Sequence, residues 1–315
     1  MTRFAFLAFI PALIGCVGMF DRVETPDLEP PTVVLRDIAN APRVARGTTI
    51  DFSDHEWLYI PEGYEPPPGG AVHLTVHFHA AAWFVIEEHW RRGARNPIFI
   101  FSGFEGSTAY RVPYEDRHRL GGNLRAVERA LADTFERDDI HVRSMELQSF
   151  SAGYGAIREI VKSPRYVEMT TAVVLGDSMY ASWTSEEDHR PLRANIAPWF
   201  PIARRAARGE MQFLVCHSDG RPSTYAGTPD TAEAVVKAIG GHLTQVEPNS
   251  IPSADPDLPF PLATRYDRGG FHVWGYGGDD PIAHMAQART MAEFWNALEQ
   301  RPMPPEASWG TETAE

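Results

Sequence analysis

One short stretch carries the residue types that nucleophilic catalysis needs. Ser151 lies in Ser149-Phe150-Ser151-Ala152-Gly153, with a small residue two positions before it and another two positions after it. The segment before this stretch, 140–147, is typical of a strand. Four apolar residues after it recur at the spacing of one buried helix face: Tyr154, Ile157, Ile160 and Val161. A serine between small residues on a sharp strand-to-helix turn is typical of an exposed nucleophile. The alternative interpretation is a helix cap rich in Ser and Gly.

The elements around this turn alternate between strand and helix patterns. Strands are predicted at 49–52, 56–61, 72–79, 96–101, 140–147, 170–175, 211–216 and 271–276. Helices are predicted at 83–91, 123–135, 154–161, 228–239 and 285–298. This alternation favours an α/β domain built on a mainly parallel sheet with helices on both faces. We place that domain at residues 47–300.

Residues 47–300 resemble the α/β-hydrolase fold, and within it a poorly characterised group of bacterial serine hydrolases. The turn around Ser151 carries the resemblance, although Ser149 stands where Gly is usual. The strand end at 77–83 is similar to a His-Gly oxyanion motif, with Ala in place of Gly. The order of nucleophile, acid and histidine along the chain also matches. The resemblance implies that the acid and the base follow later strands of the sheet.

Two histidines are candidates for the base that takes the proton from Ser151. If 271–276 is the last strand, His284 follows it at the start of the final helix, where this fold keeps its base. If 262–266 is the last strand, His272 takes that place. The segment 271–276 is more β-prone, which favours His284.

The acid and the oxyanion donors are also predicted from the positions of the strands. Asp177 ends one predicted strand and Asp219 follows the next, and we favour Asp177. The backbone N–H of Ala152, directly after the nucleophile, is the first oxyanion donor that the resemblance implies. The second comes from Ala81 or its neighbour Ala80. Ala in place of Gly requires a negative φ there.

The first residues resemble a bacterial lipoprotein signal peptide. A positive start precedes an apolar run, and residues 1–15 end in Leu13-Ile14-Gly15 before Cys16. This pattern is similar to a lipobox, in which the Cys becomes the lipid-modified first residue of the mature chain. The resemblance implies an exported lipoprotein held to the outer membrane, on the periplasmic side, by its lipid. An ordinary cleaved signal peptide is the alternative.

The segments outside the predicted domain are expected to be linkers. Residues 16–46 contain several prolines and are expected to form a tether. The β-prone segment 32–35 allows the alternative that this part wraps on the domain. Residues 301–315 are expected to form a disordered tail, and 248–261 an insertion or a lid. With Cys16 acylated, Cys216 has no partner in the chain and is expected to be a buried thiol.

Composition argues against several other classes of function. The net charge of −13 argues against a nucleic-acid partner. No run of eighteen apolar residues occurs, so no transmembrane helix is predicted. His73, His77 and His79 share one strand face, but no carboxylate or Cys joins them at motif spacing, so we predict no metal site. No phosphate-binding or dinucleotide motif indicates a cofactor.

We therefore predict a serine hydrolase that forms an acyl-enzyme on Ser151. Carboxylic esters (EC 3.1.1) are the favoured substrate class, as small-molecule or acyl esters. Four aromatic residues are candidates to line an acyl site: Trp83, Phe104, Tyr110 and Tyr154. The alternatives are a non-catalytic hydrolase-like binding lipoprotein and a serine peptidase.

Overall fold

The structure is a computed structural model, and it describes residues 25–38, 41–185, 187–246 and 259–300. One sheet has the strand order β1-β2-β4-β3-β5-β6-β7-β10-β9-β8. The strands are β1 (Gly47–Ser53), β2 (Glu56–Pro61), β3 (Ala71–Phe78), β4 (Ile98–Phe101), β5 (His141–Phe150), β6 (Thr170–Gly176), β7 (Gln212–His217), β8 (Thr244–Gln245), β9 (Leu262–Arg268) and β10 (Phe271–Tyr276). The helices are α1 (Ala82–Arg91), α2 (Ser107–Glu115), α3 (Arg119–Phe135), η1 (Ser151–Gly153), α4 (Tyr154–Ile160), α5 (Pro164–Met169), α6 (Arg193–Ile196), α7 (Trp199–Ala207), α8 (Thr228–Ala238), α9 (Pro281–Arg289) and α10 (Met291–Glu299).

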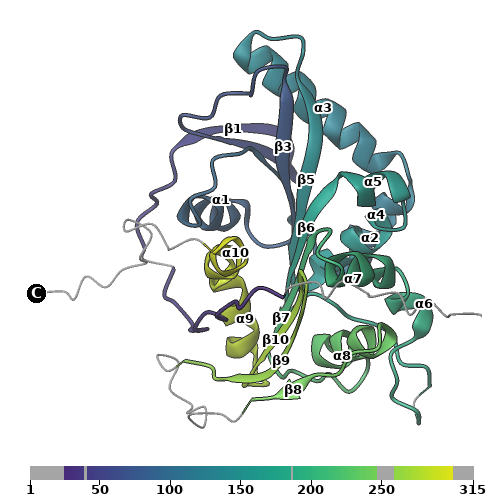
Figure 1. The fold of residues 1–315 in the computed structure, drawn as a ribbon. Helices are drawn as coiled ribbons and strands as arrows, with labels where there is room; N and C mark the ends of the chain where they lie inside the picture. Colours follow the sequence, from purple (N-terminus) through teal and green to yellow (C-terminus); the bar gives the residue numbers. More distant parts are fainter. Residues whose placement is uncertain (1–24, 39–40, 186, 247–258, 301–315) are drawn as a thin grey trace, which may run out of the picture.

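The centre of the sheet is parallel and its edges are antiparallel. Strands β4, β3, β5, β6, β7 and β10 pair in parallel. Strands β1 and β2 extend one edge, and β9 and β8 extend the other, all in antiparallel pairs. Helices α1, α9 and α10 cover one face, and α2, α3, α4, α5, α7 and α8 cover the other (Figure 1). This arrangement is the α/β-hydrolase fold, which confirms the predicted fold class.

Hydrophobic residues on both faces of the central strands build the core. In β6, Val173 and Leu175 belong to the cluster that includes residues of α4, α7 and α8. Their neighbour Val174 belongs to the cluster that includes Phe294 and Trp295 of α10. Successive side chains of a strand point to opposite faces, so a near-continuous apolar strand serves both cores.

The C-terminal part of the chain differs from the prediction in two places. The segments 262–266 and 271–276, treated as alternatives for the last strand, are both strands, and they form the β9–β10 hairpin. The single helix predicted at 285–298 is two helices, α9 and α10. They are separated at Thr290, which lies at φ −112° and ψ 9°. Its hydroxyl donates to the Ala286 carbonyl, 2.9 Å away, and so takes a backbone acceptor at the end of α9.

The tether interpretation is wrong for residues 25–38, because this segment packs on the domain. Leu28 and Val33 are buried, and Val33 pairs with Phe260 in an antiparallel bridge. The Tyr276 hydroxyl donates to the Pro31 carbonyl at 2.9 Å. Arg36 forms an ion pair with Glu293 of α10. The apolar side chains of this segment are buried against residues of α9 and α10, whereas a free spacer would leave them exposed to solvent.

Removing this N-terminal segment is expected to destabilise the domain. A chain that begins at Gly47 exposes the surface beneath Leu28, Val33 and Ile38, each of which contributes roughly 2 kcal/mol of burial. A chain that begins at Thr25 is the matched control. Urea unfolding should give a free energy of unfolding lower by several kcal/mol for the shorter chain. Equal stability of the two chains would contradict the packing role.

Several sequence predictions lie outside the described residues. These are the signal peptide at 1–15, Cys16, the tail at 301–315 and most of the 248–261 loop. Within the ranges that the structure describes, no helix combines the length and the apolar character needed to cross a bilayer. Cys216 is buried, as predicted. Burial also raises the pKa of its thiol well above the ordinary value, so the thiol stays protonated at neutral pH.

Candidate active site

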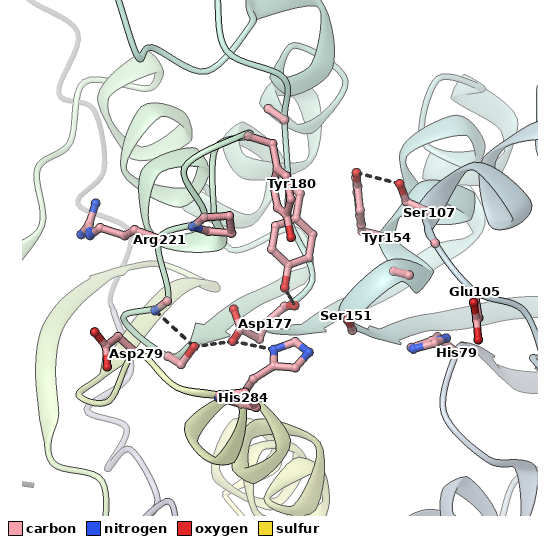
Figure 2. A pocket seen from close by; sticks show the side chains of 18 of the residues that line it. His79, Glu105, Ser107, Ser151, Tyr154, Asp177, Tyr180, Arg221, Asp279 and His284 are labelled. Carbon is pink, nitrogen blue, oxygen red and sulfur yellow. Dashed lines mark hydrogen bonds and ion pairs between the residues drawn. The ribbon is translucent and has the colours of Figure 1, made fainter. Parts of the chain in front are cut away.

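Ser151 lies on a strained turn between β5 and α4. Its φ is +48°, a left-handed value that costs a residue with a side chain roughly 1 kcal/mol. Gly153 allows the turn to close, because a Cβ at this position would lie 2.2 Å from the carbonyl oxygen of Phe78. The turn presents Ser151 at the wall of a cavity of about 910 Å³ (Figure 2).

Ser149 is linked to the turn by hydrogen bonds. It stands where proteins with this kind of turn usually have Gly. It is fully buried, and its Oγ lies 2.8 Å from Ser178 Oγ. The Ser178 hydroxyl donates to the Ser151 carbonyl at 2.7 Å, so Ser149 is the donor in the Ser149–Ser178 bond. This chain of hydrogen bonds holds the backbone of the nucleophile candidate in its left-handed conformation.

Adding a methyl group to the turn is expected to disrupt it. The Gly153→Ala variant forces the new Cβ against backbone, so we expect the free energy of unfolding to fall by about 2–4 kcal/mol. Gly122 in α3 is the matched control, because its Cβ would meet nothing within 4 Å. Gly122→Ala should raise stability by up to about 1 kcal/mol. Denaturant unfolding of both variants checks the opposite signs, and a neutral Gly153→Ala would contradict this account of the turn.

His284 and Asp177 meet beside Ser151. His284 Nδ1 lies 2.9 Å from Asp177 Oδ2. The ring packs against Phe150, with centroids 4.6 Å apart. Figure 2 shows the imidazole between Asp177 and Ser151, with its second nitrogen on the Ser151 side. With Nδ1–H donating to the carboxylate, Nε2 carries the lone pair that a general base needs. Among the described residues Ser151 Oγ has no hydrogen bond to this nitrogen, and such bonds often tighten only when substrate binds.

Asp177 is buried, and hydrogen bonds hold both its backbone and its carboxylate. Asp177 directly follows β6 at φ +43°, and its N–H donates to the Cys216 carbonyl at 2.7 Å. Ser218, after β7, donates its hydroxyl to Asp177 Oδ2 at 2.5 Å. The Tyr180 hydroxyl donates to the Asp177 carbonyl at 2.7 Å. These contacts fix the carboxylate toward His284. No sequence pattern indicates Ser218, since a single Ser after a strand is not distinctive.

The two alternative residues lie elsewhere. His272 is fully buried inside β10, and its Nδ1 lies 2.6 Å from Asp267 Oδ1 in β9. The Asp219 carboxylate is exposed at the surface and pairs with Arg221 at 3.2 Å. Neither residue lines the cavity that holds Ser151. The favoured pair, Asp177 and His284, therefore shares the cavity with Ser151, and the two alternatives do not.

The loop after β3 reaches the cavity through His79. Ala152 lines the cavity, as expected of a first oxyanion donor, whereas Ala81 does not line it and instead caps α1 at φ −64°. Ala80 has a φ of +74°, contrary to the negative value required for Ala here. The Ser102 hydroxyl donates to the Ala80 carbonyl and holds this backbone conformation.

The histidines of β3 and its end have separate partners. His73 lies 2.8 Å from Ser144 Oγ and also pairs with Glu146. His77 bonds the carbonyl of His79, and burial lowers the pKa of His77 to about 3. Burial, with repulsion from His284, lowers the pKa of His79 to about 4. Both rings are therefore neutral at pH 7.

Aromatic side chains form much of the cavity wall. Of the four predicted lining residues, Phe104 and Tyr154 line it. Trp83 instead lies under Arg43, with the guanidinium 3.2 Å from the ring centroid, and Tyr110 is fully buried. Tyr180 and Tyr225, which were not among the predicted lining residues, also line the cavity. They lie on loops after β6 and β7, where no periodicity marks them.

The chain is therefore a protein of the α/β-hydrolase fold. In its cavity, Ser, His and Asp side chains are grouped at the carboxyl ends of parallel strands. No protein-family model matches the sequence. No curated protein matches it significantly either.

Solved structures give distant matches. S-formylglutathione hydrolase from Agrobacterium tumefaciens is 12% identical, with a TM-score of 0.42 over 78% of this chain and 89% of the other. The feruloyl esterase module from Clostridium thermocellum is 10% identical, with a TM-score of 0.45 over 88% and 94%. An uncharacterised protein from Capnocytophaga ochracea is 10% identical, with a TM-score of 0.44 over 84% and 67%. Similarity at this level assigns no activity to this chain.

Proposed function

We propose that this protein is a serine hydrolase that cleaves carboxylic esters through an acyl-enzyme on Ser151. The observation that carries the proposal is the 2.9 Å contact between His284 Nδ1 and Asp177 Oδ2 beside a serine on a left-handed turn. A non-catalytic binding protein has no need of a buried carboxylate held on a histidine beside such a serine. A buried, strained and hydrogen-bonded arrangement of this kind is typical of catalysis.

The proposed reaction has two halves. Ser151 Oγ attacks the ester carbonyl carbon while His284 Nε2 takes the hydroxyl proton, and Asp177 stabilises the imidazolium that results. The bond to the alcohol oxygen then breaks, and the alcohol leaves with the proton from His284. Water attacks the acyl-enzyme in the same way, releases the carboxylic acid and restores Ser151. Ala152 N–H donates to the carbonyl oxygen as its negative charge develops.

A paired substrate assay tests the reaction class. p-Nitrophenyl butyrate and butyryl p-nitroanilide share one acyl group and release chromophores from oxygen and from nitrogen. We expect hydrolysis of the ester without detectable hydrolysis of the anilide, because p-nitrophenolate leaves more readily than the nitrogen of p-nitroaniline. Hydrolysis of the anilide as well as the ester would favour a serine peptidase. Hydrolysis of neither by folded protein would favour a non-catalytic binding role.

The proposal includes export and lipid attachment at Cys16. The basis is the sequence of residues 1–15 and Cys16 alone. Metabolic labelling with an alkyne fatty acid in a Gram-negative host tests it, with Cys16→Ser as the comparison and Cys216→Ser as the matched control. Label should be lost only in Cys16→Ser. Label retained in that variant would contradict lipid attachment at Cys16.

A further inference from the structure

His79 is a second histidine on the wall of the cavity. It directly follows β3, whose Phe78 pairs with Ser149 of β5, so it lies next to the Ser151 turn. Its ring stacks on Phe150 with centroids 6.0 Å apart, and Phe150 also contacts His284. Figure 2 shows His79 and His284 on opposite sides of Ser151. The backbone of His79 lies at φ +73°, a strained value that its surroundings must maintain.

The hydrogen bonds of Tyr110 determine which nitrogen of His79 carries the proton. The Tyr110 hydroxyl lies 2.8 Å from His79 Nδ1, 3.2 Å from the Phe104 carbonyl and 3.3 Å from the Phe104 N–H. A hydroxyl has one hydrogen to donate. If it donates to the Phe104 carbonyl, Phe104 N–H and His79 Nδ1–H both donate to the hydroxyl oxygen, and all these contacts are satisfied. If it donated to His79, two oxygens would face each other without a hydrogen between them.

The Nδ1–H form leaves a lone pair on His79 Nε2. Since the Nδ1 side faces Tyr110, this nitrogen lies at the cavity end of the ring (Figure 2). Burial first, and repulsion from His284 second, lower the pKa of His79 to about 4, so at pH 7 the ring stays neutral and Nε2 accepts hydrogen bonds.

Several other polar groups of the wall are acceptors or donors already engaged, and the hydroxyls of Ser107, Ser182 and Tyr225 can both donate and accept. Glu105 and Asp279 contribute carboxylates. The Arg221 guanidinium is bound to Asp219 and Asp230. The Tyr180 hydroxyl donates to a backbone carbonyl. Hydrogen-bond donors on a substrate therefore find acceptors here, both in these carboxylates and in the lone pair of His79 Nε2.

We propose that His79 is a substrate-positioning residue whose Nε2 accepts a hydrogen bond from a substrate hydroxyl, so that the preferred esters are those of polyols or sugars. This inference rests on the proposed ester hydrolysis and names the substrate class of the same site. The aromatic faces of Tyr154, Tyr180 and Tyr225 add apolar surface for the carbon skeleton of such an alcohol.

A matched pair of esters tests the inference. Glycerol 1-acetate and n-propyl acetate have the same acyl group and the same number of alcohol carbons, and only the first carries free hydroxyls. Wild-type kcat/KM should favour glycerol 1-acetate. In His79→Asn, which keeps a residue tolerant of positive φ, the ratio should fall by about five- to tenfold, mainly through KM. The propyl acetate value should change by no more than about twofold. A purely structural role would lower both values together and would overturn the inference.

A second measurement does not depend on turnover. Nitrogen-15 NMR of the imidazole at pH 7 should show His79 protonated at Nδ1 and bare at Nε2, and Tyr110→Phe should remove this preference. A proton on Nε2 in the wild-type protein would overturn the inference. Equal hydrolysis of the two esters with an unchanged ratio in His79→Asn would overturn it and leave the hydrolase function standing. Hydrolysis of neither ester by folded protein would contradict both the inference about His79 and the proposed ester hydrolysis.

Discussion

Replacing His284 with alanine is expected to lower kcat for ester hydrolysis by about four to six orders of magnitude. The change removes the base that takes the Ser151 proton and returns it to the leaving alcohol. The His284 side chain is partly exposed, so its loss leaves no large buried void and the domain should stay folded. Steady-state kinetics with p-nitrophenyl butyrate, alongside circular dichroism, measures both effects.

The matched control is His272→Ala, which should have the opposite pattern. His272 is buried, and its removal leaves Asp267 without one of its hydrogen-bond partners in the β9–β10 hairpin. We expect a loss of about 2–4 kcal/mol in the free energy of unfolding. The kcat of the molecules that remain folded should be nearly unchanged. An inactive but stable His272→Ala, together with an active His284→Ala, would reverse the assignment of the base.

Replacing Asp177 with asparagine is expected to lower kcat by about 10⁴-fold. The substitution preserves the shape of the side chain, but it removes the charge that holds the Nδ1–H form of His284 and stabilises the imidazolium. Because Ser218 also donates to the carboxylate, a small loss of stability should accompany the change.

Asp219→Asn is the matched control for the acid. Its exposed carboxylate pairs with Arg221 at the surface, so the substitution should change stability by less than about 0.5 kcal/mol and kcat by only a few-fold. Measuring both variants on one ester separates the two candidates. A large loss of kcat in Asp219→Asn, with near-normal kcat in Asp177→Asn, would show that the acid is Asp219.

The parts of the fold that local patterns determine could be predicted from the sequence. The buried face of α4, formed by Tyr154, Ile157 and Ile160, follows from helical spacing, and the central strands follow from their apolar runs. Small residues around Ser151 mark the sharp turn, because Gly153 cannot carry a Cβ beside Phe78. These features depend on neighbours within a few positions along the chain.

The parts that depend on distant contacts could not be predicted. The choice between Asp177 and Asp219 depends on where the two strand ends place their side chains relative to α9, and spacing does not encode this. Residues 25–38 have the prolines of a tether, yet Val33 pairs with Phe260, more than two hundred positions away. Ser218 and the lone pair of His79 act through single hydrogen bonds, which leave no periodic signal in a sequence.

The most direct test of the account is labelling by a fluorophosphonate probe, which reacts with an activated serine. We would label the chain from Thr25 onward and its Ser151→Ala and Ser149→Ala variants, and locate the adduct by peptide mass spectrometry. We expect an adduct on Ser151 in the parent chain. We expect no labelling of Ser151→Ala, and continued labelling of a folded Ser149→Ala, because Ser149 is buried beneath the turn. A folded parent chain that takes no label, or an adduct on another residue, would contradict the proposal that Ser151 is the nucleophile.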